Sequence, residues 1–233
     1  MAAWGKTLLV IDDRLRSEIL SLLSPSYEDP TQLVERELAN CDTLYTDRDP
    51  SGALKCFFMV GWHELRIGDE MHGAVYLGLS AASPDVQNTA RVRALYDKFN
   101  SDAAKWERER CRDLILWFTT ATPSAYYAGA NVFDKAEPYL DGTYSVWYQQ
   151  IVAAIRERQG YAEQPHPFVI KNVALGTRYS QRELERIEKV CAKSGFTLFE
   201  DLGVNERMGD RLLVVCRPRI HEPRATQGVL ASC

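Results

Sequence analysis

The hydrophobic and polar positions of this chain follow two periods in turn, and the clearest change of period lies between Gly73 and Phe99. This stretch opens with an apolar run, crosses a polar turn at Ser83-Pro84-Asp85, and continues with apolar residues at helical spacing. The pattern predicts a strand, a turn and an amphipathic helix. The segments on both sides are predicted to build one sheet around this strand.

Two helices and a meander of three strands are predicted before the polar turn. Asp12 or Asp13 is placed to cap the first helix, and Asp29 to cap the second, with Pro30 at its first helical position. Short turns separate the apolar runs that follow, which is typical of antiparallel hairpins. The strands are expected over residues 41–47, 54–62 and 74–79. The second of them is apolar enough to be buried on both faces.

A continuous apolar run follows the amphipathic helix over residues 112–118. Because a helix separates the two runs, we expect this strand to pair in parallel with the central one. Thr122 is expected to cap a helix that begins at Pro123. The rest is predicted to form helices over 144–158 and 181–194, and strands over 168–174, 196–199 and 211–216.

The resulting fold class is α/β, with a mixed, mostly antiparallel sheet flanked by helices. We expect one domain over residues 1–216 and a mobile, Pro-rich tail over residues 217–233. The composition is that of an ordinary globular protein, with 45% hydrophobic and 26% charged residues among 233.

Charge and cysteine usage narrow the expected partners and compartment. The net charge of −4 argues against nucleic acid or an anionic membrane surface as the main partner. No apolar run approaches the about 20 residues of a membrane span, and no secretory signal is recognised at the N-terminus. The six cysteines form no Cys-x-x-Cys pair, so we expect a reducing, cytoplasmic compartment and no metal site.

The order of elements resembles the GCN5-related N-acetyltransferase (GNAT) superfamily over residues 12–216. In that superfamily, a Gln/Arg-x-x-Gly-x-Gly/Ala turn follows the fourth strand and holds the pyrophosphate of acetyl-CoA on backbone N–H groups. The matching residues here are Gln87, Asn88, Thr89, Ala90, Arg91 and Val92. The resemblance implies acetyl-CoA or another acyl-CoA as co-substrate, bound at this turn and at Leu79 and Ala81 of the preceding strand.

Two of these residues depart from the pattern of the superfamily. Ala90 and Val92 stand where the superfamily has a glycine and a second small residue. Glycine lets a phosphate approach the backbone closely, so Ala90 narrows the approach, and Val92 does so if its branch points to the ligand rather than the core. Arg91 and Arg93 could supply compensating charge. A plain turn and helix cap without a ligand explains the same residues, and both interpretations stay open.

Acyl transfer to an amine needs a base for the amine proton and an acid for the departing thiolate. The resemblance implies a tyrosine acid on the helix after the parallel strand, where Tyr126 and Tyr127 lie. Glu64, next to His63 at a strand end, is the candidate base, and a surface position explains both residues as well. No Ser-His-Asp spacing, His-Glu-x-x-His motif or P-loop supports a hydrolase, zinc protease or nucleotide triphosphatase.

The predicted function is that of an N-acyltransferase for a small-molecule amine, by direct attack of the amine on the thioester. The alternative is a catalytically inactive domain of the same shape that binds a ligand or a protein. The oligomeric state stays open, with a homodimer among the options.

Overall fold

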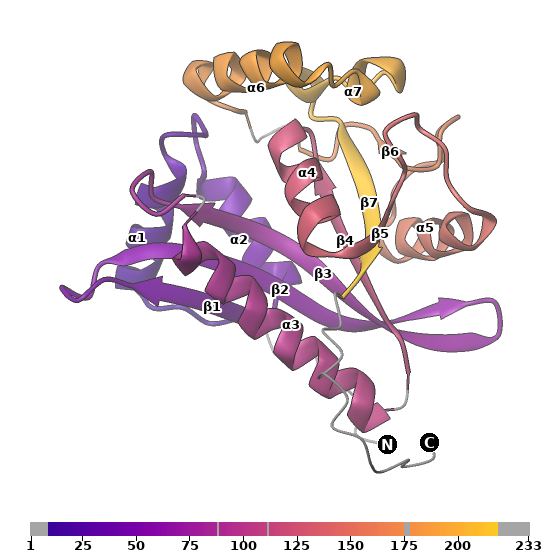
Figure 1. Ribbon diagram of the computed structural model, residues 1–233, viewed down its shortest axis with the longest axis horizontal. Coiled ribbons are helices and arrows are strands. Elements are labelled where there is room, and N and C mark those ends of the chain that lie inside the picture. The colour runs from indigo at the N-terminus through magenta and orange to yellow at the C-terminus, as the bar shows by residue number, and fades with distance from the viewer. Residues whose placement is uncertain (1–8, 88, 111, 175–177, 219–233) are drawn as a thin grey trace.

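The computed structural model describes residues 9–87, 89–110, 112–174 and 178–218, which fold around one mixed sheet (Figure 1). In this part of the chain six strands of the sheet follow the order β1 (Thr43–Arg48), β2 (Leu54–Ile67), β3 (Glu70–Ala82), β4 (Leu114–Thr120), β7 (Arg211–Arg217), β5 (Asp134–Glu137), and a seventh strand, β6 (Val169–Ile170), pairs with β7. All paired strands are antiparallel except β3 and β4. The predicted fold class is confirmed. Residues 219–233 of the predicted tail lie outside the described residues.

Two helices precede the sheet, α1 (Asp13–Leu23) and α2 (Thr31–Asn40). The predicted cap of α1 is confirmed, because the Asp12 carboxylate accepts a hydrogen bond from a first-turn amide at 2.7 Å. The predicted cap of α2 is wrong by one residue, since Pro30 occupies the N-cap position. Asp29 instead accepts from the first amide of the helix at 3.0 Å, in the turn that leads into it.

The meander consists of β1 (Thr43–Arg48), β2 (Leu54–Ile67) and β3 (Glu70–Ala82). β2 and β3 extend further than predicted, because only Gly68 and Asp69 form the turn between them. Gly68 has a φ of +59°, a value that two-residue hairpin turns require. The added part of the hairpin mixes exposed and buried side chains, so no continuous apolar run marks it in the sequence.

Both faces of the sheet are covered at β2. Phe57 and Met59 pack with α1 and α2, whereas Phe58 and Val60 belong to the cluster that contains residues of α3 (Ala90–Arg110). Figure 1 shows α3 crossing one face of the sheet, with α1 and α2 on the other. The prediction that this strand is buried on both faces is confirmed.

The crossover after α3 follows the prediction. It leads into β4 (Leu114–Thr120), which pairs in parallel with β3. Thr122 caps α4 (Pro123–Val132), with its hydroxyl accepting from a first-turn amide at 3.2 Å. The four-residue β5 (Asp134–Glu137) was not predicted, because its only strand signal is its pairing with β7 (Arg211–Arg217).

The C-terminal third differs more from the prediction. Its elements are α5 (Val146–Gln159), β6 (Val169–Ile170), α6 (Gln181–Ser194), α7 (Leu198–Asp201), a 3-10 turn (Glu206–Met208) and β7. The predicted strand over 168–174 is reduced to the two residues of β6. The strand predicted over 196–199 is wrong, because the Thr197 carbonyl and hydroxyl bind the amide and carboxylate of Asp201 at 2.9 Å and 2.7 Å. These contacts, four residues apart, favour a helical turn.

Two features are absent from the described ranges. No helix there combines the length and apolarity that crossing a lipid bilayer takes. No cluster of three or more His, Cys, Asp or Glu side chains in those ranges is arranged to hold a metal ion.

Candidate functional site

The two parallel strands separate from each other at one end (Figure 1). Among the described residues, β3 and β4 pair only over 73–76 and 114–117. Beyond this point β3 continues to Ala82 along β2, and β4 continues to Thr120 along β7. The backbone N–H and C=O groups along the two facing edges therefore require partners other than each other. The gap is a candidate site for an extended ligand.

A cleft of about 280 Å³ lies where the strands begin to separate. Tyr76 and Trp117, the last residues that pair, line it with ring centroids 4.4 Å apart. Thr119 lines it two residues further along β4. The other lining residues come from α2, α5, the segments after α5 and β6, and β7: Arg36, Asn40, Gln159, Tyr161, Val173, Ala174 and Arg211. The cleft therefore combines aromatic walls with two arginines at the start of the gap.

A neutral histidine supports the Trp117 ring. Trp117 Nε1 donates to His63 Nε2 at 3.1 Å, and His63 Nδ1 donates to the Gly61 carbonyl at 3.1 Å. Because Nε2 accepts, the ring proton is on Nδ1. Burial lowers the pKa of His63 to about 4, and the positive charge of Arg158 acts in the same direction. His63 therefore supports the cleft, and the surface position considered from the sequence is wrong.

Behind the wall of the cleft, α2 carries a buried carboxylate. Glu37 is 2% exposed, and its Oε1 accepts a hydrogen bond from Arg36 at 3.1 Å. Its Oε2 has no hydrogen-bond partner among the described residues. Burial raises the pKa of Glu37, and the positive charge of Arg36 and the neighbouring Tyr76 hydroxyl oppose this effect. Arg36 also donates to the Val173 carbonyl at 3.1 Å, which links α2 to the opposite wall of the cleft.

Gly78 makes room for the Glu37 carboxylate on β3. A Cβ atom at this position would lie 3.0 Å from Glu37 Oε2 and 2.7 Å from Cys41 Sγ. The free oxygen of Glu37 is therefore directed at β3, two residues beyond Tyr76, where β3 no longer pairs with β4. The cleft, the gap and this carboxylate occupy one region of the molecule.

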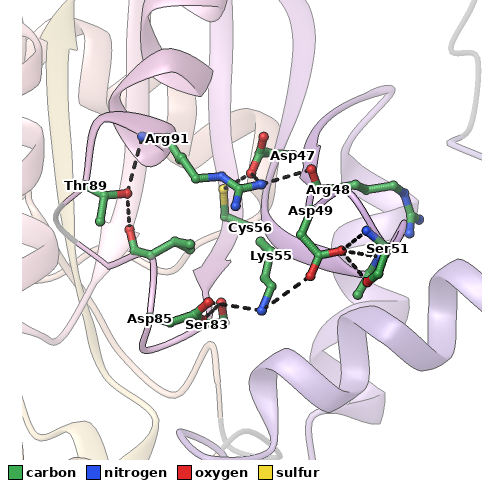
Figure 2. A network of polar contacts seen from close by, with 12 residues as sticks. Asp47, Arg48, Asp49, Ser51, Lys55, Cys56, Ser83, Asp85, Thr89 and Arg91 are labelled. Atoms are coloured by element: carbon green, nitrogen blue, oxygen red, sulfur yellow. Dashed lines mark hydrogen bonds and ion pairs between the residues drawn. The ribbon is translucent and has the colours of Figure 1, made fainter.

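The predicted donor-binding turn lies between β3 and α3, and a polar network holds it against the turn between β1 and β2 (Figure 2). Lys55 Nζ donates to the Asp85 carboxylate at 3.0 Å and lies 3.7 Å from Asp49. The Ser83 hydroxyl also donates to Asp85, at 2.5 Å. Lys55 therefore balances the negative charge that Asp85 places at this turn.

Arg91 is directed away from the turn, as Figure 2 shows. Its Nη2 lies 2.5 Å from the Asp47 carboxylate and donates to the Arg48 carbonyl at 2.9 Å. The Thr89 hydroxyl accepts from the Arg91 amide at 3.3 Å, so one N–H group of the helix start is already bonded. A pyrophosphate at this turn would meet the positive end of the helix dipole but not the Arg91 guanidinium.

The two residues that depart from the superfamily pattern have different surroundings. Val92 packs against the core cluster, so its branched side chain points inward rather than toward a ligand. Ala90 is exposed at the first position of α3, where its methyl group narrows access to the backbone. Arg93 is exposed one residue after Val92.

The other predicted donor contacts lie on the strand side of the turn. Gln87 Nε2 donates to the carbonyl of Ala82 at 2.9 Å, so this side chain closes the turn on itself. Leu79 and Ala81 pack in the cluster formed with α1 and α2. Asn88 lies outside the described residues.

The predicted catalytic residues are not among those that line the cleft. The Tyr126 hydroxyl donates to the Pro138 carbonyl at 2.7 Å, and burial raises the pKa of Tyr126 to about 12. Tyr127 is half-buried beside it, with ring centroids 5.9 Å apart. Glu64 is exposed and pairs with Gly73, three residues and about 10 Å before the strands separate.

One signal in the sequence pointed to Glu37. Leu33, Val34 and Leu38 form the apolar face of α2. Glu37 falls on that face, four residues after Leu33 and three after Val34. Glutamate is rarely fully buried unless it is paired, so a glutamate on such a face indicates a special role. The other residues of the cleft come from separate segments, and no spacing in the sequence connects them.

No protein-family model matches the chain, and no curated protein matches it in sequence. Solved structures that are partly similar include the following two. One is a conserved protein of unknown function from Enterococcus faecalis V583, described as a "Probable N-Acyltransferase". It aligns with a TM-score of 0.39 and 13% identity, over 54% of this chain and 32% of that protein. The other is the ribosomal-protein-S18-alanine N-acetyltransferase from Escherichia coli. It aligns with a TM-score of 0.39 and 10% identity, over 95% of this chain and 99% of that protein. This chain thus spans about a third of the first protein's length.

Proposed function

We propose that this protein is an N-acyltransferase that moves an acyl group from acyl-CoA to a small-molecule amine. The observation that carries this proposal is the coincidence of the cleft with the point where β3 and β4 separate. The gap suits a thin, extended arm, and the cleft of about 280 Å³ suits a small acceptor. The resemblance of the element order to the GNAT superfamily points to the same chemistry.

The acyl donor is matched to the gap by its hydrogen-bonding groups. The pantetheine arm of CoA is an extended chain with two amides. Amides of this kind can satisfy the backbone donors and acceptors that β3 and β4 no longer use on each other, as an added strand would. The thioester at the end of the arm then lies next to the cleft, where the Tyr76 and Trp117 rings exclude water from it.

The turn before α3 contributes less to donor binding in this proposal than the gap does. A helix start favours a pyrophosphate through its dipole, and the inward position of Val92 leaves that approach open. Ala90 and the bonded Arg91 limit the contribution. We therefore assign most donor affinity to the gap.

The reaction is a direct transfer that conserves atoms and charge. The amine nitrogen attacks the thioester carbon, the new C–N bond forms, and the C–S bond breaks. The thiolate of CoA leaves with the electron pair of that bond and takes up a proton to become the thiol. The acceptor enters as an ammonium ion, so one proton is released for each transfer.

The test combines binding and turnover. Calorimetry measures acetyl-CoA binding, and a panel of small primary amines is assayed for free thiol and, by mass spectrometry, for the amide product. Gln159→Trp fills the cleft from the end of α5, and we expect it to raise the KM for the amine at least about tenfold. Gln149→Trp places the same ring on an exposed position of the same helix and should leave the KM unchanged.

The outcomes separate the two candidate functions. An absence of acetyl-CoA binding together with an absence of amide product for every amine would rule out the acyltransferase. The ion pair between Arg91 and Asp47 favours the alternative of a ligand-binding domain without catalysis, because it removes a cation that a tight CoA site would use. Binding of acetyl-CoA without any product would support that alternative.

A further inference from the structure

Glu37 differs from the other buried carboxylates in the described part of the chain. These carboxylates belong to Glu37, Glu137, Glu183 and Asp210. The last three accept hydrogen bonds on both carboxylate oxygens. The donors are Tyr139 and Ser145 for Glu137, Arg186 for Glu183, and Lys171, Asn172 and Asn205 for Asp210. Glu37 has a bond on Oε1 alone. A buried oxygen without a partner is costly to keep, which points to a ligand that supplies one.

The position of the unpartnered oxygen identifies the ligand group. Glu37 Oε2 lies against Gly78, on the part of β3 that no longer pairs with β4. Arg36, which binds the other oxygen, lines the cleft and has a side chain that is 38% exposed. Glu37 itself is not among the residues that line the cleft, so access from the cleft requires the Arg36 side chain to shift. A cation in the cleft would then reach Glu37 at the entrance to the gap.

We propose that Glu37 is the catalytic base of the proposed acyltransferase and accepts the proton of the acceptor ammonium. This inference rests on the proposed function and adds a residue to it. The first N–H proton of the ammonium moves to the Glu37 carboxylate, and the freed lone pair attacks the thioester carbon. The second proton leaves the nitrogen as the C–S bond breaks and ends on the thiolate. The acceptor is thus an amine that is protonated at neutral pH.

The surroundings of Glu37 are consistent with this role. Burial raises its pKa, which makes the carboxylate a stronger base than an exposed glutamate. The titratable groups that face it are Arg36 and Cys41 on α2 and at its end, Tyr76 on β3, and Tyr161 after α5. Burial raises the pKa of the thiol and of both phenols, so only Arg36 among them is charged at neutral pH.

The test is Glu37→Gln assayed with two classes of amine. Glutamine keeps the volume and an oxygen for Arg36 but cannot take up a proton. For an alkylamine, which is an ammonium ion at pH 7, we expect kcat/KM to fall by about 10²- to 10⁴-fold. For an arylamine that is already neutral at pH 7, we expect a fall within about threefold. A loss of structure would lower both rates equally.

A pH profile and a control variant sharpen the test. For the alkylamine, the wild-type kcat/KM should not change with pH between the pKa of Glu37 and the pKa of the amine. Over the same range, the kcat/KM of Glu37→Gln should rise about tenfold per pH unit. Glu183→Gln removes a buried carboxylate that is paired with Arg186 and is not among the residues that line the cleft, so it should keep the wild-type profile.

Equal losses with both amines, or an unchanged profile in Glu37→Gln, would overturn the role of Glu37 and leave the acyltransferase standing. An absence of amide product from every amine with the wild-type protein would overturn both.

Discussion

Replacing Glu37 by glutamine should stabilise the fold, and the gain should grow with pH. Burial raises the pKa of Glu37 in the folded protein above its ordinary value of 4.5. For an acid with a raised pKa, the contribution to stability is fully present below the unfolded pKa and is lost as the pH rises through the folded pKa. The wild type therefore carries the cost of the buried charge at pH 8, and the neutral glutamine does not.

The size of the effect follows from the contacts of Glu37. Glutamine puts a neutral amide group in place of the charged, unpartnered oxygen, which relieves about 1–3 kcal/mol of the cost of burying that charge. The hydrogen bond from Arg36 is weaker to an amide oxygen than to a carboxylate, which offsets about 1 kcal/mol of this gain in stability. Arg36 keeps its bond to Val173, and its side chain is 38% exposed, so its charge stays solvated. A net gain of about 1 kcal/mol corresponds to a Tm increase of about 2–4 °C for a chain of this size.

Thermal unfolding by circular dichroism between pH 5 and pH 8.5 measures this gain, in buffers of equal ionic strength. Glu137→Gln is the matched control, because Glu137 is also 2% exposed but accepts hydrogen bonds on both oxygens, from Tyr139 and Ser145. It should lose about 1–2 kcal/mol, since both bonds weaken when the acceptor is no longer charged. A Tm of Glu37→Gln below the wild type at pH 8 would show that the pair with Arg36 outweighs burial, and would refute the reasoning.

Three further predictions concern neighbouring features. Gly78→Ala should cost about 1–3 kcal/mol in urea unfolding, because the new Cβ would lie 2.7 Å from Cys41 Sγ and 3.0 Å from Glu37 Oε2. It should also slow acylation of alkylamines. Arg91→Ala should change the Kd of acetyl-CoA in calorimetry by less than about tenfold, because Arg91 binds Asp47. If Arg91 bound a phosphate of CoA instead, the substitution would cost about 1.5–3 kcal/mol of binding free energy. His63 should remain the neutral Nδ1–H tautomer in ¹⁵N NMR until about pH 4. Its contribution to the stability of the fold is therefore present above pH 6.5 and is lost as the pH falls toward 4. Protonation of the His63 ring near pH 6.5 would contradict this prediction.

Local chemistry predicted the ends of elements well. Asp12 and Thr122 cap helices because their side chains reach amides three residues away, and Gly195 ends α6 in the left-handed conformation that glycine adopts readily. The turn at Asp49 is equally local, because its carboxylate binds the amides of Ser51 and Ala53. Such features depend on neighbours in sequence, so a single sequence contains them.

Features that depend on distant partners were missed. The four residues of β5 form a strand because β7 lies beside them, and the half-exposed end of the β2–β3 hairpin has no continuous apolar run. The site shows the same limit. The turn before α3 lies where the sequence predicted it, but the partner of Arg91 is Asp47, which is 44 residues earlier in the chain. The cleft combines side chains of separate segments, and only Glu37 carried a signal of its own.

The place of β7 in the sheet has a consequence for synthesis of the chain. β7 is the last described strand, yet it lies between β4 and β5. On the ribosome, the β2–β3 hairpin can form early from residues close in sequence, but the apolar edge of β4 stays unpaired until residues 211–217 emerge. An uncovered edge of this kind recruits other strands. Chains that stall before β7 should therefore aggregate, and the wall of the cleft formed by Arg211 is completed only after β7 emerges.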